Sequence, residues 1–210
     1  MRKKLHNLNL LFGKSMLRQF KTATKPALPS MFSSKKKEVF RRCLDQATGY
    51  FEYGSGGSTA IANGITNLLR ITSVETDYEW AKKVHEVCPD VNMVWVDIGP
   101  TKEFGQPADE TLRLAWPRVP EVWLLAEQAY DVVLIDGRFR VACAALICLV
   151  PKQVKRICFD DFTIRPQYHV ILPFIDILET VDSMIVCQPK SGLDRVALQE
   201  LYDTYKYDPA

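Results

Sequence analysis

The chain has 210 residues, of which 47% are hydrophobic, 25% charged and 10% aromatic. This composition is typical of one globular domain and excludes a disordered chain. Its net charge of +2 conceals an asymmetry, because residues 1–37 hold ten Lys or Arg and no acid, whereas residues 38–210 hold 17 basic and 25 acidic residues. General nucleic-acid binding is therefore not predicted, and since no apolar run reaches the roughly 18 residues that a membrane helix needs, no membrane span is expected.

Residues 1–33 are predicted to form a segment apart from the folded domain. Apolar residues recur there at helical spacing between Lys and Arg: Leu5, Leu8, Phe12, Met16 and Phe20. A basic, acid-free, amphipathic segment is typical of a mitochondrial presequence, which predicts the mitochondrial matrix as the location. The alternative is a disordered basic tail, and a start at Met16 or Met31 would remove the signal, which leaves the cytoplasm.

From residue 34 onward the pattern alternates between helices and strands. Strands are expected over residues 50–53, 71–75, 91–97, 131–136, 156–160 and 184–187, and helices over 34–46, 58–67, 78–87, 121–128, 141–150 and 166–180, with 193–205 helical or mixed. Short apolar strands joined by helices indicate a parallel sheet buried on both faces. The predicted fold class is therefore α/β: a Rossmann-like, doubly wound, mostly parallel sheet with helices on both faces, in one domain over residues 34–210.

Acidic residues mark the ends of the first five predicted strands: Glu52, Glu75, Asp97, Asp136, and Asp160 with Asp161. Ligands of such sheets bind outside the carboxyl ends of the strands. Each acid alone is as readily explained as the cap of a following helix. Several acids along one edge, however, need a cation, a polar ligand or basic side chains to offset their charge.

The loop after the first strand carries a motif. It reads Phe51-Glu-Tyr-Gly54-Ser-Gly-Gly57-Ser58, and Glu75 follows 21 residues after Gly54. With Asp97 and the segment Val133-Leu-Ile-Asp136-Gly137, this loop resembles the cofactor-binding fingerprint of class I S-adenosylmethionine-dependent methyltransferases over about residues 38–188. It also resembles the loop of small uncharacterised methyltransferase-like proteins. Ser58 stands where the G-x-G-x-G form has its last glycine.

The resemblance implies an S-adenosylmethionine site. Its expected residues are Glu52, Gly54, Ser55, Gly56, Gly57, Ser58, Glu75, Asp97 and Asp136. Glycines let the backbone approach a ligand, the helix start at Ser58 can hold a carboxylate, and Glu75 can accept from both ribose hydroxyls. Asp97 is expected at the adenine amino group, and Glu52 at the methionine ammonium.

Dinucleotide-binding folds share such a loop and are the main alternative. Their loops prefer an apolar residue where Glu52 stands, and Thr59 occupies the third glycine position of G-x-G-x-x-G. An NAD-linked oxidoreductase and a non-catalytic or repurposed Rossmann-like binding protein therefore remain as alternatives to a methyltransferase.

The last acids also resemble a metal site. In cation-dependent O-methyltransferases such acids hold magnesium against the acceptor oxygens, which implies Asp136, Asp160 and Asp161 as Mg²⁺ ligands. This chain departs from that pattern, since Gly137-Arg-Phe-Arg140 follows where another acid or Lys is usual. Its arginines can instead neutralise the acids or bind an anionic acceptor. Asp160 or Asp161 can also act as a plain base or cap the next turn.

The predicted function is methyl transfer from S-adenosylmethionine to a small-molecule acceptor, at oxygen. A small acceptor is expected because the chain is small and has no added recognition domain. The catalytic candidates are Asp136, Asp160 and, as a base on the predicted helix after the fifth strand, His169. Residues 98–118 form an irregular insert with Trp116, which is expected either to cover the site or to pack on the body. Trp80 is expected in the core. The sequence leaves the oligomeric state open.

Overall fold

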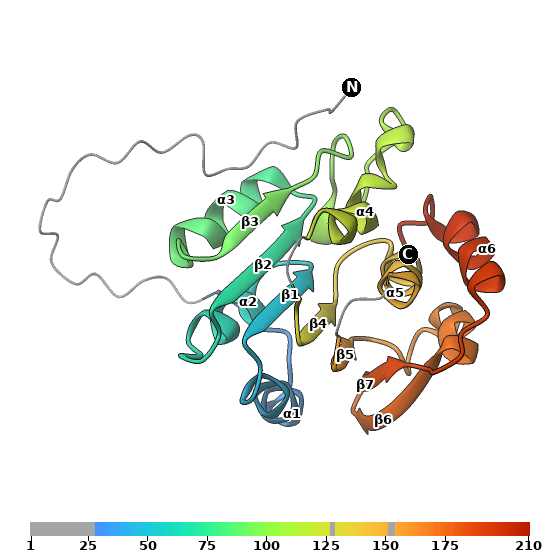
Figure 1. The fold of residues 1–210 in the computed structure, drawn as a ribbon. Coiled ribbons are helices and arrows are strands. Elements are labelled where there is room, and N and C mark those ends of the chain that lie inside the picture. Colours follow the sequence, from blue (N-terminus) through green and yellow to red (C-terminus); the bar gives the residue numbers. More distant parts are fainter. Residues whose placement is uncertain (1–27, 127–128, 151–153) are drawn as a thin grey trace, which may run out of the picture.

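The computed structural model describes residues 28–126, 129–150 and 154–210 (Figure 1). Most of the predicted targeting segment lies outside these residues. Among the described helices, none combines the length and the apolar character needed to span a bilayer.

Seven strands form a single sheet in the order β3-β2-β1-β4-β5-β7-β6. They are β1 (Gly49–Tyr53), β2 (Arg70–Glu75), β3 (Asn92–Trp95), β4 (Val132–Ile135), β5 (Arg156–Phe159), β6 (Ile175–Val181) and β7 (Met184–Pro189). The first five strands pair in parallel. β7 runs antiparallel to β5, and β6 antiparallel to β7. The mostly parallel Rossmann-like sheet predicted from the sequence is confirmed.

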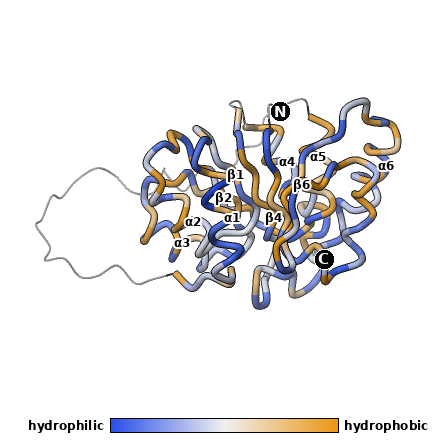
Figure 2. The backbone as a smooth tube through the Cα atoms, turned by 90° about the horizontal axis from the view of Figure 1, so that it is seen from below, coloured by the Kyte–Doolittle hydropathy of each residue, from blue (hydrophilic) through white to orange (hydrophobic). Residues whose placement is uncertain are grey.

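Helices cover both faces of the sheet, as predicted (Figure 1). They are α1 (Ser34–Leu44), α2 (Gly57–Asn63), α3 (Tyr78–Val87), α4 (Arg118–Leu125), α5 (Arg140–Leu149) and α6 (Arg195–Tyr205), with 3₁₀ turns at Glu103–Gly105, Arg113–Ala115 and Pro166–Phe174. Successive residues of β1 point to opposite faces. Tyr50 packs edge-on against Phe40 of α1, and Phe51 packs edge-on against Trp123 of α4. The central strand β4 is hydrophobic throughout and buried between these layers (Figure 2).

The predicted helix over residues 166–180 is wrong. Residues Pro166–Phe174 form 3₁₀ turns, and Ile175–Val181 form strand β6, which pairs with β7. Pro173 has no backbone N–H to donate and its ring obstructs a helix. The β-branched residues Ile175, Ile177 and Val181 favour a strand, and pairing with β7 decides the outcome.

The folded domain begins before residue 34. Ser33, not Ser34, caps α1, because its hydroxyl accepts from the backbone N–H of Lys36. Leu28 joins the hydrophobic cluster beneath α3, and Phe32 packs edge-on against Phe40. Residues 28–33 therefore belong to the domain, which corrects the predicted boundary.

Candidate functional site

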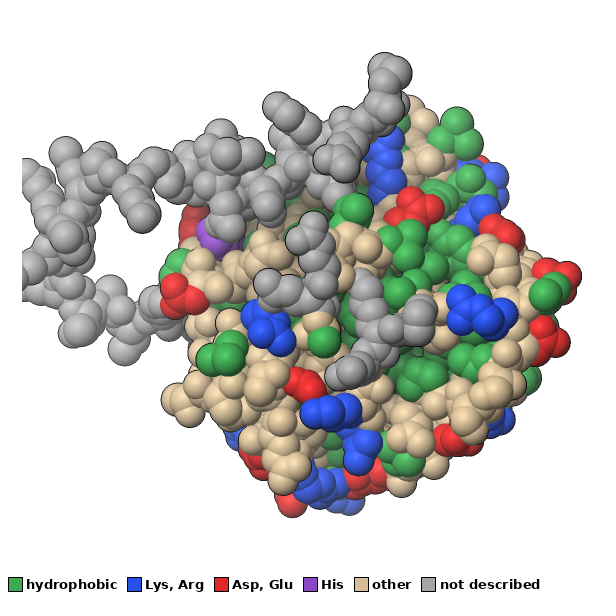
Figure 3. Space-filling view, viewed as in Figure 1, with side chains coloured by type: hydrophobic (Ala, Val, Ile, Leu, Met, Phe, Trp, Pro, Cys, Tyr) green, Lys and Arg blue, Asp and Glu red, His purple; other side chains and the backbone are tan. Residues whose placement is uncertain are grey.

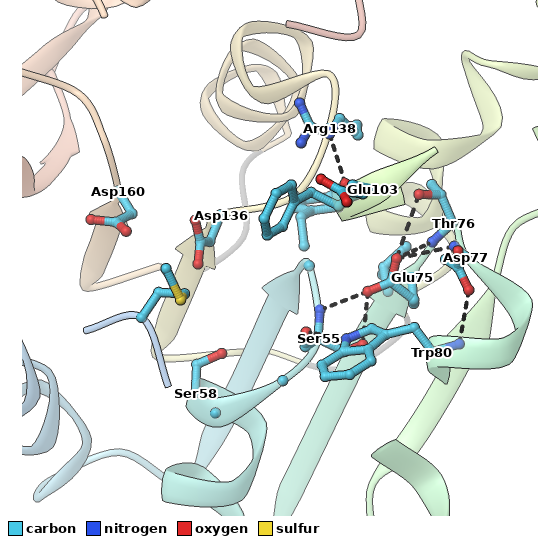
Figure 4. Close-up of a pocket in the computed structure, with 18 of the residues that line it drawn as sticks. Ser55, Ser58, Glu75, Thr76, Asp77, Trp80, Glu103, Asp136, Arg138 and Asp160 are labelled. Atoms are coloured by element: carbon cyan, nitrogen blue, oxygen red, sulfur yellow. Dashed lines mark hydrogen bonds between the residues drawn. The ribbon is translucent and has the colours of Figure 1, made fainter. Parts of the chain in front are cut away.

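A cavity of about 1020 Å³ lies at the carboxyl ends of β1, β2, β4 and β5. Two groups of polar side chains lie in its wall, and Figure 4 shows members of each. The first, called the β2 end, comprises Glu75, Thr76, Asp77 and Trp80. The second, called the β5 end, comprises Lys36, Asp136, Arg140, Asp160, Asp161 and Arg165. All five predicted loop residues, Gly54, Ser55, Gly56, Gly57 and Ser58, also line the cavity. The sequence therefore identified the edge of the sheet at which the cavity lies.

The glycines of the loop are needed for different reasons. Gly54 has a φ of +90°, and a Cβ there would lie 2.6 Å from the backbone nitrogen of Gly137. A Cβ at Gly57 would lie 2.5 Å from the Cα of Ser30. These two glycines are thus required by contacts within the protein, not by approach to a ligand. Gly56 has a φ of +153°, and a Cβ there would lie 3.6 Å from Trp80, in ordinary van der Waals contact, so its backbone conformation and not a clash calls for glycine.

Glu75 at the end of β2 holds the loop in place. Its Oε2 accepts from the backbone N–H of Ser55 at 3.0 Å and from the Ser55 hydroxyl at 2.8 Å. Its Oε1 accepts from the backbone N–H groups of Thr76 and Asp77, at 2.7 and 3.1 Å. A carboxylate offers about four acceptor sites, so all four are in use. A ligand hydroxyl can reach Glu75 only by replacing one of these donors, and the Ser55 hydroxyl is the one that can rotate away.

Trp80 lines the cavity and also packs against the hydrophobic cluster beneath α3, so the expected core packing accounts for only part of its role. It lies in the first turn of α3, after the cap Asp77, and its indole N–H donates to the carbonyl of Ser55 at 2.8 Å. The ring therefore forms the wall beside Glu75 and Ser55 (Figure 4). Its position in the first turn after a strand-end acid was the signal in the sequence that could have identified it.

Glu52 does not reach the cavity, which corrects its predicted role. It shares a face of β1 with Tyr50, so its side chain points under α2 and is fully buried. The carboxylate accepts from the hydroxyls of Tyr50, Ser58 and Thr59. Burial raises the pKa of Glu52, and these hydrogen bonds partly oppose that shift. Glu52 fixes the start of α2 from below through Ser58 and Thr59.

Two other predicted site residues also lie outside the cavity lining. Asp97 is exposed, and its carboxylate accepts from the backbone N–H of Gly99 in a local turn. His169 lies in the 3₁₀ segment after β5, where Nε2 is 3.0 Å from the carbonyl of Phe162 and the two rings are in contact. The structure therefore does not bring Asp97 or His169 into the cavity wall, where roles at adenine and as a base were expected.

The insert over residues 98–118 does both things expected of it. Its first half lines the cavity through Thr101–Phe104, and Gly105 lies against Thr76 and Glu75. Its second half packs on the body, because Trp116 is buried and its ring lies against Phe139, which precedes α5.

Arg138 reaches the insert from the segment after β4. Its Nε–H donates to the carbonyl of Phe104 at 2.9 Å. Burial lowers the pKa of Arg138. This contact holds the first half of the insert beside the cavity.

Three carboxylates meet at the β5 end. One oxygen each of Asp136, Asp160 and Asp161 lie within 4.8 Å of one another. The pKa of Asp136 is raised to about 7, first because it is desolvated in the cavity floor and then because Asp160 and Asp161 are close, while Arg140 opposes the shift. Its side chain lines the cavity and is 29% exposed. Asp136 is thus the group here that titrates near neutral pH.

Basic side chains already neutralise these acids. Lys36 contacts Asp160 at 2.5 Å, and Arg140 contacts Asp136 at 3.2 Å and Asp161 at 3.6 Å. Arg165 lies 3.5 Å from Asp161. Three cationic side chains therefore face three carboxyl groups, of which Asp136 is only partly ionised near neutral pH, and a divalent cation added among them would leave excess positive charge. The cluster has the oxygen ligands of a magnesium site but not its charge, so the residues present do not fit the predicted ion.

Acidic and basic side chains are interspersed over the face of the molecule seen in Figure 3.

No protein-family model matches the chain, and no curated protein matches it. A methyltransferase-like protein from Silicibacter pomeroyi DSS-3 has a solved structure that matches with a TM-score of 0.79 and 28% identity, over 87% of this chain and 99% of that one.

Two further structures match weakly. One is the N-methyltransferase NodS from Bradyrhizobium japonicum WM9 in complex with S-adenosyl-L-homocysteine, with a TM-score of 0.41 and 9% identity over 73% of this chain and 85% of that one. The other is the 23S rRNA methyltransferase ErmE, with a TM-score of 0.39 and 13% identity over 86% of this chain and 78% of that one. At these scores they say nothing about the site of this chain.

Proposed function

Since the chain has the class I S-adenosylmethionine-dependent methyltransferase fold that its glycine loop predicted, we propose that it transfers a methyl group from S-adenosylmethionine to a small-molecule acceptor. The observation that carries the proposal is that Ser55 of the glycine loop and Glu75 of β2 meet on the wall of one large cavity. The volume, about 1020 Å³, is at the upper end of the roughly 300–1,000 Å³ of ligand pockets. It has room for a cofactor and a small acceptor together.

The β2 end suits the adenosyl part of the cofactor. Glu75 can accept from a ribose hydroxyl once the Ser55 hydroxyl turns away, and the Trp80 ring offers a flat wall beside it. Gly56 puts no Cβ between the loop backbone and the Trp80 ring. Ser30 also lines the cavity, and its buried hydroxyl has no hydrogen-bond partner among the described residues. A ligand group placed there would satisfy it.

The β5 end suits the acceptor. The bound sulfonium supplies an electrophilic methyl group, so the protein has only to orient the acceptor and remove its proton. Asp136 can take that proton, because a base with a pKa near the working pH is the most effective. The residues thus favour an acceptor oxygen or nitrogen that loses a proton, and we propose oxygen.

Calorimetry with S-adenosylhomocysteine, S-adenosylmethionine and NAD tests the cofactor. We expect saturable binding of the first two and none of NAD, and binding of NAD alone would favour an oxidoreductase. Transfer of label from methyl-labelled S-adenosylmethionine to a panel of small hydroxylated acceptors tests the reaction. Tight cofactor binding without turnover across the panel would favour a non-catalytic binding protein.

A further inference from the structure

We propose that the ammonium group of Lys36 takes the place of a divalent cation at the β5 end, so that the cavity receives an acceptor oxygen through an N–H donor and binds no metal. The part of this proposal that concerns the acceptor rests on the proposed function. The part that concerns metal binding is independent of it, because it depends only on the charges of side chains in the cluster.

Lys36 is built into the cluster from the far end of the chain. It lies in the first turn of α1, is 7% exposed, and lines the cavity. Its Nζ donates to Oδ1 of Asp160 at 2.5 Å and to Oγ of Ser183 at 2.6 Å. An ammonium has three N–H donors. Two are used by Asp160 and Ser183, and the third has no partner among the described residues, so it can serve a ligand in the cavity.

The neighbours of Lys36 explain why a buried ammonium is tolerated. Asp160 is itself 4% exposed, so the pair is shielded from water on both sides. The Phe32 ring lies 5.8 Å from Nζ and adds a cation–π contact. Removing one member of such a pair leaves an uncompensated buried charge. The pair is thus a fixed part of the fold and not a fluctuating surface contact.

Charge decides between Lys36 and a metal. Asp136, Asp160 and Asp161 already face Lys36, Arg140 and Arg165. A metal ion bound to all three acids would bring its charge close to that of Nζ, which already contacts Asp160. Without Lys36 the cluster carries one excess negative charge and an open space beside Asp160. A divalent cation could then bind.

For an oxygen acceptor the third N–H of Lys36 has a defined use. The acceptor O–H bond breaks, its proton goes to Asp136, and the electron pair stays on oxygen. That pair forms the new bond to the methyl carbon while the C–S pair goes to sulfur. Lys36 donates to the oxygen as its negative charge grows, which is the service that a metal would otherwise provide.

Divalent-cation binding to the full chain without cofactor tests the proposal. Melting temperature and Mn²⁺ electron paramagnetic resonance are measured with Mg²⁺, Ca²⁺ and Mn²⁺ for the wild type, Lys36→Met and Lys35→Met. Lys35 is exposed on the same helix and is the matched control. We expect no saturable response in the wild type and in Lys35→Met. In Lys36→Met we expect saturable Mn²⁺ binding, with an affinity at least tenfold above the upper limit measured for the wild type.

Saturable cation binding by the wild type would overturn the proposal, as would a folded Lys36→Met that gains none. If Lys36→Met does not fold, Lys36→Gln keeps a donor to Asp160 without the charge and should gain binding in the same way. These measurements need no cofactor, so a failure to bind S-adenosylhomocysteine would count against the proposed function alone. In the acceptor panel, turnover that requires magnesium would also contradict the role given to Lys36.

Discussion

Ser55 and Glu75 are joined by two hydrogen bonds to one carboxylate oxygen, from the Ser55 backbone N–H at 3.0 Å and from its hydroxyl at 2.8 Å. The backbone bond fixes the glycine loop against β2. If the cavity binds S-adenosylmethionine as proposed, the hydroxyl bond occupies the acceptor site that a ribose hydroxyl would use. Ser55 would then compete with the cofactor for Glu75.

Ser55→Ala tests this competition. The substitution frees one acceptor site on Glu75 and keeps the backbone bond, so we expect S-adenosylhomocysteine to bind at least as tightly as to the wild type. Calorimetry measures the affinity, with circular dichroism as a check of folding. A tenfold loss of affinity in the folded variant would mean that the hydroxyl itself binds the ligand.

Gly54→Ala should destabilise the domain. At φ +90° an added Cβ is strained and meets the backbone of Gly137 at 2.6 Å, and strain of this kind alone costs roughly 1–3 kcal/mol. Gly64→Ala is the matched control, because Gly64 has a φ of −86° and the nearest atom to an added Cβ is 3.5 Å away. Urea unfolding of both variants gives the comparison, and equal stabilities would refute the packing reason given for Gly54.

Arg140→Met should be among the most damaging single changes. Arg140 is 5% exposed, contacts Asp136 and Asp161, and donates to the carbonyl of Asp160. Removing one partner of a buried ion pair costs about 3–5 kcal/mol. Arg42→Met removes a solvent-exposed pair with Glu179 and should leave stability unchanged within error. Similar losses in the two variants would show that the cluster at the β5 end does not depend on Arg140.

The pKa of Asp136 predicts a pH dependence of stability. The folded value of about 7 lies above the ordinary 3.8, so the folded protein holds this proton more tightly than the unfolded chain. Its contribution to stability is present at low pH, falls as pH rises from about 4 to about 7, and is then constant. Asp136→Asn removes this loss. The free energy of unfolding of the variant minus that of the wild type, measured in urea, should therefore be larger at pH 8 than at pH 5. A difference that does not change with pH would show that the pKa of Asp136 is not raised.

The parts of the site that follow a strand directly could be predicted from the sequence. The glycine loop, Glu75 and Asp136 stand where parallel strands end, and the sheet brings such ends to one edge. Glu52 could not be placed correctly by its position alone. Side-chain alternation along β1 turns it beneath α2, and recognising this required the faces on which Tyr50 and Phe51 pack.

The partners of the acids could not be predicted, because they come from distant segments. Lys36 is 124 residues from Asp160, and its neighbours Lys35 and Lys37 look identical in the sequence. Only the packing of α1 on the sheet turns Lys36 inward. β6 was missed for a related reason, since its pairing with β7 overrides the helix-like apolar spacing of residues 166–180.

The most direct test of the account is calorimetric titration of S-adenosylhomocysteine into the wild type and Glu75→Ala. The account predicts saturable binding to the wild type and an affinity lower by roughly 1–3 kcal/mol in Glu75→Ala, because the variant loses hydrogen bonds to the ribose and the anchor of the Ser55 backbone. An absence of binding to the wild type, or equal affinity in a folded Glu75→Ala, would contradict the assignment of the cavity as a cofactor site.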